Sequence, residues 1–196
     1  MTWSVDHAAD PVRSSSWWNL PNALTVLRLL LVPVFAVLLL RGDGADTDRV
    51  LAAVVFVVAS ATDFADGAIA RRRGIVTTFG KVVDPIADKA LTGTALVLLS
   101  VLGDLPWWVT VVILVREIGV TLLRFWVIRR GVIPASRGGK AKTVAQMLAI
   151  LLYLLPVTGW LETARTAVLA VALLLTVLTG ADYVVRAVRL RRAVAS

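Results

Sequence analysis

Long apolar runs alternate with short polar segments along this chain of 196 residues. A helix needs about 20 apolar residues to cross the hydrocarbon core of a bilayer. Six runs are candidates, and the second and third reach that length only when the aspartate-bearing segments beside them are included. The runs cover residues 20–40, 50–61, 90–102, 106–128, 144–157 and 164–185. The pattern predicts an all-α, polytopic membrane protein with six transmembrane helices.

The overall composition agrees with this interpretation. Hydrophobic residues make up 58% of the chain, and the mean hydropathy of +0.82 is typical of membrane proteins. We expect one six-helix domain over residues 20–192. Residues 1–19 lack the apolar core of a signal peptide, and we expect them to form a short amphipathic segment on the cytoplasmic side. In that segment, Trp17 and Trp18 are typical of side chains that anchor at a membrane surface.

The net charge of +8 is unevenly distributed. Acidic residues dominate the connections after the first, third and fifth runs, whereas basic residues gather in the other connections and at the carboxyl end. The positive-inside rule therefore places both termini in the cytoplasm of a multi-pass protein in the cell membrane. The chain contains no nucleic-acid-binding motif, so the basic excess indicates membrane topology and attraction of anions rather than a nucleic-acid partner.

Some kinds of chemistry are excluded by residues that the chain lacks. It contains no cysteine, so a thiol nucleophile, a disulfide and an iron–sulfur centre are excluded. The single histidine, His7, lies in the polar amino-terminal segment. We therefore expect neither acid–base catalysis by histidine nor a histidine-bound zinc ion.

Four aspartates interrupt the apolar pattern. Asp63 and Asp66 are three residues apart, and Asp84 and Asp88 are four apart, so each pair occupies one face of its helix. An antiparallel hairpin turning near Gly74 brings the pairs to similar depth. One ionised aspartate in the middle of a spanning helix costs about 2.5–3.5 kcal/mol on insertion scales. Such a cluster needs countercharge, and all-oxygen ligation favours Mg²⁺ or Mn²⁺.

A structural interpretation of the aspartates is that they pair with nearby basic residues, Arg71–Arg73 and Lys81. Loose surface pairing does not require a one-face register on both helices, so we favour the metal site. Gly67 and Gly80 leave room beside the carboxylates, and Arg71 is placed to reach a phosphate. Two metals that share carboxylates can clamp a phosphoryl group during in-line attack. These residues predict metal-dependent chemistry on a phosphate ester at a membrane surface.

The stretch "DFADGAIARRRGIVTTFGKVVDPIAD" resembles the signature of the CDP-alcohol phosphatidyltransferases, D-x2-D-G-x2-A-R-x8-G-x3-D-x3-D. All eight fixed positions match: Asp63, Asp66, Gly67, Ala70, Arg71, Gly80, Asp84 and Asp88. Two further stretches, "NLPNALTVLRLLLVPVF" and "VREIGVTLLRFWVIRRGVIPASRGGKAKTVAQM", are similar to the bacterial phosphatidylglycerophosphate synthase branch of this family, particularly its actinobacterial members.

The resemblance implies a homodimeric six-helix enzyme whose active site faces the cytoplasm and is open to membrane lipid. It implies that Asp63, Asp66 and Asp84 ligate two metal ions, and that Asp88 completes the site and acts as general base. The residues implied in binding the donor, CDP-diacylglycerol, are Asn22, Thr25, Gly67, Arg71, Thr77 and Gly80, together with Asp63 and Asp66. The implied reaction transfers the phosphatidyl group to sn-glycerol 3-phosphate and releases CMP.

Basic residues later in the chain are candidates for binding the phosphate of the acceptor. Arg116 and Arg124 are eight residues apart on one helix face. Arg116 could instead pair with the adjacent Glu117, because a buried arginine is costly unless it is paired. The candidates beyond this helix are Ser136, Lys140 and Lys142, all in a connection that we expect to be too polar for burial.

Two other functions remain open at this point. The chain could be another member of the family, such as a phosphatidylinositol phosphate synthase or a cardiolipin synthase, because a basic pocket does not choose among anionic acceptors. It could also be a cation transporter that uses the acidic cluster for transit. A transporter would not require Gly67, Arg71 and Gly80 at these spacings.

Overall fold

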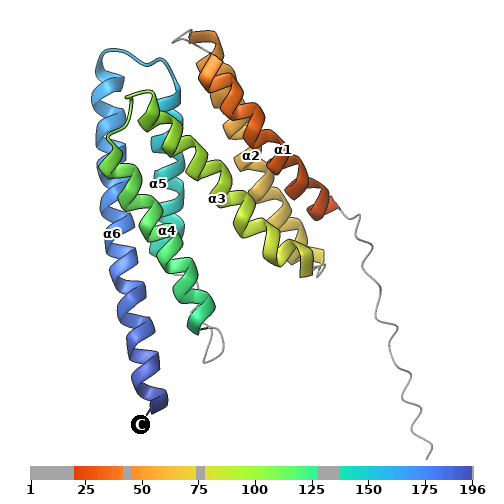
Figure 1. Ribbon diagram of the computed structural model, residues 1–196, viewed down its shortest axis with the longest axis vertical. Coiled ribbons are helices and arrows are strands. Elements are labelled where there is room, and N and C mark those ends of the chain that lie inside the picture. The colour runs from red at the N-terminus through yellow and green to blue at the C-terminus, as the bar shows by residue number, and fades with distance from the viewer. Residues whose placement is uncertain (1–19, 42–45, 74–77, 128–136, 196) are drawn as a thin grey trace, which may run out of the picture.

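The computed structural model describes residues 20–41, 46–73, 78–127 and 137–195, with side chains described over 23–41, 46–62, 86–87, 89–123 and 138–189. The all-α prediction is confirmed over this part of the chain. Its helices are α1 (Leu20–Arg41), α2 (Asp46–Arg73), α3 (Thr78–Val101), α4 (Trp107–Val127), α5 (Arg137–Leu154) and α6 (Trp160–Ala195). Successive helices run up and down, so the segments that carry the aspartates and most basic residues gather at one end of the bundle (Figure 1).

Two helices extend well beyond the apolar runs that predict them. α2 begins at Asp46, and acidic residues in a first turn interact favourably with the helix dipole. It continues through Asp63 and Asp66 to Arg73, and α3 carries Asp84 and Asp88. Each predicted carboxylate pair therefore lies on a continuous helix, as its spacing requires.

One prediction about the connection before α5 is wrong. We expected the basic segment that contains Lys140 and Lys142 to be too polar for burial, but α5 begins at Arg137 and includes both lysines. Lys142 is only 3% exposed. The physical reason is an ion pair, because its ammonium group contacts the carboxylate of Glu117. A paired charge is buried at much lower cost than an isolated one.

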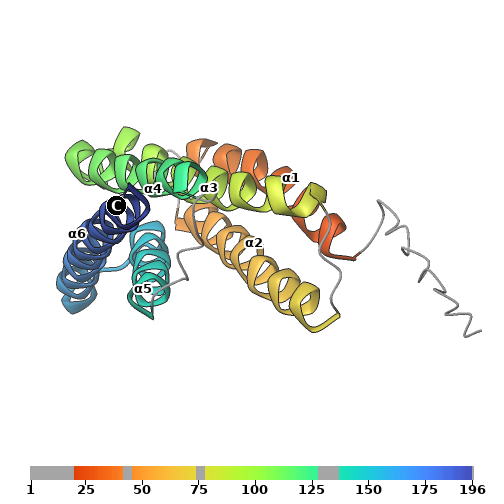
Figure 2. The same cartoon turned by 90° about the horizontal axis from the view of Figure 1, so that it is seen from below.

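The core is built on small side chains that let helices approach closely. α2 contributes Ala52, Ala53 and Ala59, all buried against its neighbours. Phe35 of α1 and Phe56 of α2 fill the space beside them, with ring centroids 6.0 Å apart. α1 packs extensively against both α2 and α3, whereas α2 and α3 contact each other much less. In the view from below, α3 lies between α1 and α4 (Figure 2).

The end of the bundle opposite the aspartates is held by polar contacts. Gly103 ends α3 with a φ of 81°, a conformation that glycine adopts without strain. The next residue, Asp104, pairs with Arg49 of α2. Ser100 and Thr110 share a buried hydrogen bond of 2.7 Å between α3 and α4. These contacts fix the angle at which α4 enters the bundle.

Two helices in the described part of the chain are long and apolar enough to cross a bilayer. The stretch Ala23–Arg41 has a mean hydropathy of 2.6 and Trp160–Arg189 one of 2.2, and few of their residues are buried inside the molecule. The stretch Lys89–Val101 is apolar but shorter. Large apolar side chains are also exposed on α4, including Val115 and Leu122. These features indicate a membrane protein, and the number of spans stays a prediction.

Candidate functional site

The predicted metal and donor site maps to the ends of α2 and α3 that residues 74–77 connect. The side chains of Asp63, Asp66, Asp84 and Asp88 lie outside the described residues, so their grouping stays a prediction. The same holds for the side chains of Asn22, Gly67, Arg71 and Gly80, and for Thr77 as a whole. Their helices show that the two carboxylate pairs are carried by consecutive, antiparallel segments. Four carboxylates in this arrangement fit the oxygen preference of a hard divalent cation.

α1 presents a buried polar face to the part of α2 that precedes the signature. Thr25, one of the predicted donor contacts, is 1% exposed, and Arg28 on the next turn is fully buried. Arg28 Nε donates to the carbonyl of Ala59 at 3.3 Å, and Thr62 Oγ1 donates to the same carbonyl at 2.7 Å. Ala59 lies one helical turn before Asp63. A permanent positive charge is thus held close to the first predicted ligand.

Arg28 is a candidate that the sequence interpretation missed. An arginine in the middle of an apolar helix is expensive within a membrane, and it usually faces a polar site. Its spacing of three residues from Thr25 places both on one helix face. This shared face with Thr25 is the feature of the sequence from which Arg28 could have been predicted.

A second site lies between α3, α4 and α5, where the described side chains line a cavity of about 130 Å³. Its polar lining consists of Lys89, Thr92, Glu117, Lys142, Thr143 and Gln146. The volume is well below the roughly 300–1,000 Å³ of pockets for drug-sized ligands. The cavity therefore suits a small polar molecule rather than a nucleotide or a lipid chain.

The charges around this cavity are unbalanced toward the positive. Glu117 accepts a hydrogen bond from Lys142, contacts Lys89 Nζ at 3.5 Å and pairs with Arg116 at 2.9 Å. Of these three cations only Lys89 and Lys142 line the cavity with Glu117, so its described lining residues carry one positive charge in excess. Such an excess favours an anion, for example a phosphate group.

Arg116 turns away from the cavity toward α6. Its second guanidinium nitrogen donates to Thr179 Oγ1 at 2.8 Å. Gly180 provides the space, since a Cβ there would lie 3.1 Å from Arg116 Cγ. These contacts favour the structural alternative for Arg116, in which pairing with Glu117 and α6 satisfies its charge.

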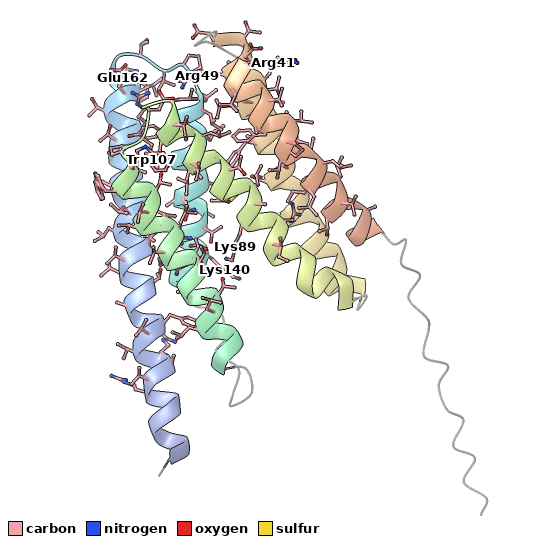
Figure 3. All side chains as sticks on the ribbon, in the orientation of Figure 1. Arg41, Arg49, Lys89, Trp107, Lys140 and Glu162 are labelled. Carbon is pink, nitrogen blue, oxygen red and sulfur yellow. The ribbon has the colours of Figure 1, made fainter. Side chains whose placement is uncertain are left out.

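The other predicted acceptor residues differ in their positions. Lys142 lines the cavity, whereas Lys140 is exposed and lies outside its lining. In Figure 3, Lys89 and Lys140 lie lower in the bundle than Arg41 and Glu162, which are at its top. The side chain of Arg124 and the whole of Ser136 lie outside the described residues.

Lys89 and Gln146 are cavity residues that the sequence interpretation missed. Lys89 directly follows Asp88 on α3, and Gln146 lies one turn beyond Lys142 on α5. Their closeness in sequence to Asp88 and Lys142 could have indicated them. Only the packing of three helices shows that Lys89 and Gln146 line the same cavity.

Comparison with known proteins identifies the family of the chain. The sequence profile of the CDP-alcohol phosphatidyltransferases matches residues 18–178. A relative from Mycobacterium tuberculosis, described as a probable phosphatidylglycerophosphate synthase, is 59% identical over 172 residues, which cover 87% of this chain and 82% of the relative.

Two more distant relatives are described as CDP-diacylglycerol–glycerol-3-phosphate 3-phosphatidyltransferases. The one from Bacillus subtilis is 38% identical and covers 85% of this chain and 93% of the relative. The one from Escherichia coli is 36% identical, with 85% and 93% covered. The profile and the relatives both span the helices that carry the aspartates and the cavity. The chain therefore belongs to the CDP-alcohol phosphatidyltransferase family and is a transferase of that class.

Proposed function

We propose that this protein transfers the phosphatidyl group of CDP-diacylglycerol to sn-glycerol 3-phosphate, giving phosphatidylglycerophosphate and CMP. The observation that carries the proposal is the likeness to relatives described by this activity, at 38–59% identity over most of the chain. That likeness includes the helices that carry the complete aspartate signature. The small cationic cavity beside the signature supports a small anionic acceptor.

In this proposal the donor occupies the end of the bundle where α1, α2 and α3 meet. Asp63, Asp66 and Asp84 would hold divalent cations, Mg²⁺ or Mn²⁺, with Asp88 completing the set. Bound there, the ions would neutralise the pyrophosphate of the donor and stabilise charge that develops on its oxygens. Family members are generally dependent on divalent metals, and the carboxylate donors fit such ions.

The other predicted donor contacts would bind the nucleotide. Thr25, together with Asn22, would close over it from α1, while Arg71 and Thr77 would contact its phosphates. Gly67 and Gly80 would leave room for it beside the carboxylates. The buried Arg28 would offset part of the negative charge of the aspartates, since a cation nearby stabilises a carboxylate cluster.

The chain's own residues would then carry the transfer. The terminal hydroxyl oxygen of glycerol 3-phosphate forms a bond to the phosphorus of the diacylglycerol phosphate. The bond from that phosphorus to the bridging pyrophosphate oxygen breaks, and CMP leaves with its electron pair. Asp88 accepts the hydroxyl proton. Lys142, with Arg124, Ser136 and Lys140 as further candidates, would hold the phosphate of the acceptor so that its hydroxyl reaches the donor.

We further propose a homodimer in the cell membrane with six spans and both termini in the cytoplasm. The gathering of the basic helix ends at one end of the bundle supports this topology. Cysteine labelling of single-cysteine variants at the connections after α1 and α2 would test it. The natural chain contains no cysteine to interfere.

The deciding experiment is an assay of the purified protein with CDP-diacylglycerol, Mg²⁺ and a panel of acceptors. We expect CMP release with glycerol 3-phosphate and little with inositol phosphate or phosphatidylglycerol. Preferential use of inositol phosphate would overturn the proposed acceptor and favour a phosphatidylinositol phosphate synthase. Preferential use of phosphatidylglycerol would favour a cardiolipin synthase. Membership of the family already argues against a cation transporter.

A further inference from the structure

Gln146 is a buried polar side chain that the proposed reaction has not yet used. It lies on α5, lines the cavity between α3, α4 and α5, and is only 4% exposed. Among the described residues, its carbonyl oxygen Oε1 has no hydrogen-bond partner. Leaving a buried acceptor without a donor is costly, so a residue of this kind indicates a missing partner.

The chemistry of the cavity indicates what that partner is. Gln146 and Lys142 are four residues apart on α5 and thus share one helix face. Lys89 enters from α3, so two lysines and one glutamine line the same small space. Ammonium groups bind phosphate, and a carbonyl oxygen accepts a hydrogen bond from a hydroxyl group. The set therefore suits a small molecule that carries both groups.

Glycerol 3-phosphate has two hydroxyl groups, and the reaction uses only the terminal one. We propose that Gln146 is the residue that recognises the middle hydroxyl, accepting its hydrogen bond at Oε1 while Lys89 and Lys142 hold the phosphate. Gln146 is then a specificity-determining residue, because an acceptor without that hydroxyl leaves Oε1 unpaired. This inference rests on the proposed function.

Glu117 has a supporting part in the same arrangement. Its contacts with Lys89 and Lys142 link α4 to both α3 and α5. It thereby positions the two ammonium groups before the acceptor arrives, which reduces the cost of ordering them on binding.

The test compares glycerol 3-phosphate with 3-hydroxypropyl phosphate, which keeps the terminal hydroxyl but lacks the middle one. For the unaltered protein we expect kcat/KM to be at least about tenfold higher with glycerol 3-phosphate, since the analogue leaves Oε1 unpaired. In Gln146→Leu we expect the ratio to fall toward one, with the KM for CDP-diacylglycerol unchanged. Val144→Ala, on the exposed face of the same helix, is the matched control and should keep the original ratio.

A stability measurement separates recognition from a structural role. If Oε1 awaits a ligand, Gln146→Leu should unfold in detergent at an unchanged or higher temperature, because an apolar side chain of similar size replaces an unpaired buried acceptor. A clear loss of stability would instead indicate a structural partner and overturn the proposal. So would equal kcat/KM values for the two acceptors with the unaltered protein, a result that does not depend on any variant folding.

The two proposals fail in different ways. If no CMP is released with glycerol 3-phosphate, the proposed function itself is wrong. If glycerol 3-phosphate is used well but the ratio is the same in Gln146→Leu and the unaltered protein, only the role of Gln146 is wrong.

Discussion

The predicted aspartate site and the proposed acceptor cavity are built in different ways. The aspartates lie on two consecutive helices, so their spacing in the sequence already determines which of them share a face. The cavity draws Lys89 from α3, Glu117 from α4 and Gln146 from α5. A motif can be recognised when its residues are close in sequence, whereas a cavity between three helices depends on packing. Three predictions test whether the two sites have the separate roles that this difference suggests, and a fourth tests a contact that holds Arg116 outside the cavity.

The largest effect is expected at the predicted metal ligands. Asp63→Asn, Asp66→Asn and Asp84→Asn should each lower kcat by about 10²–10³-fold or more, because each removes a charge that holds the ions against the pyrophosphate. Turnover in saturating Mg²⁺ and the unfolding temperature are the measurements. Asp182→Asn, at an exposed ion pair on α6, is the control and should keep its activity. Near-normal turnover in any one of the three variants would remove that residue from the site.

The next prediction separates the base from the ligands. Asp88→Asn should lose the chemical step to a similar extent, since an amide cannot accept the hydroxyl proton, but it should still bind CDP-diacylglycerol. Single-turnover kinetics and equilibrium binding of the donor measure the two properties. If donor binding falls as far as it does in Asp63→Asn, Asp88 is needed to retain the metal and the division of roles is wrong.

A smaller effect, confined to the acceptor, is expected in the cavity. Lys142→Met should raise the KM for glycerol 3-phosphate about ten- to a hundredfold, because a charge-assisted hydrogen bond contributes about 1.5–3 kcal/mol. The KM for the donor should change little. Lys140→Met should have a smaller effect, since an exposed charge contributes about 0–1 kcal/mol. A larger effect of Lys140→Met than of Lys142→Met would show that the acceptor phosphate binds outside the cavity, near the amino end of α5.

The sequence predicts the aspartate site more fully than the cavity, and the reason is physical. Residues that share a helix face can be recognised from their spacing, so the sequence is enough to group Asp63 with Asp66 and Asp84 with Asp88. The burial of Lys142 cannot be recognised in this way, because its partner, Glu117, is 25 residues away and on another helix. In the sequence, Gln146 is an ordinary polar residue within an apolar helix. Only packing shows that its oxygen is buried without a partner among the described residues.

The same reasoning applies to the fold. Hydropathy and the spacing of the aspartates together predict that two helices continue through the charged signature, but they do not predict which polar side chains of neighbouring helices are buried against them. Arg28 shows this clearly. Its burial against Ala59 depends on the packing of α1 on α2, which the apolar run of α1 does not reveal.

The smallest effect concerns the contact that turns Arg116 away from the cavity. Gly180→Ala should destabilise the protein by about 1 kcal/mol, because the new methyl group meets Arg116 Cγ at 3.1 Å while both ends of the guanidinium are held. In an Arg116→Ala background the same change should stabilise by up to about 1 kcal/mol, since alanine is the better helix former. Unfolding in detergent completes the double-mutant cycle. Equal effects in both backgrounds would show that the two residues do not restrain each other.

Asp88 and Lys89 are consecutive residues of α3, one belonging to the proposed transfer site and the other to the acceptor cavity. A helix advances about 1.5 Å and turns about 100° with each residue. Inserting or deleting one residue between Asp84 and Thr92 would therefore rotate one site out of register with the other, and no loop nearby could absorb the change. The connection 155–159, at the other end of the bundle, carries no such restraint. Differences in chain length among relatives should accordingly fall in connections such as this one and leave this stretch of α3 constant, which an alignment of many members can check.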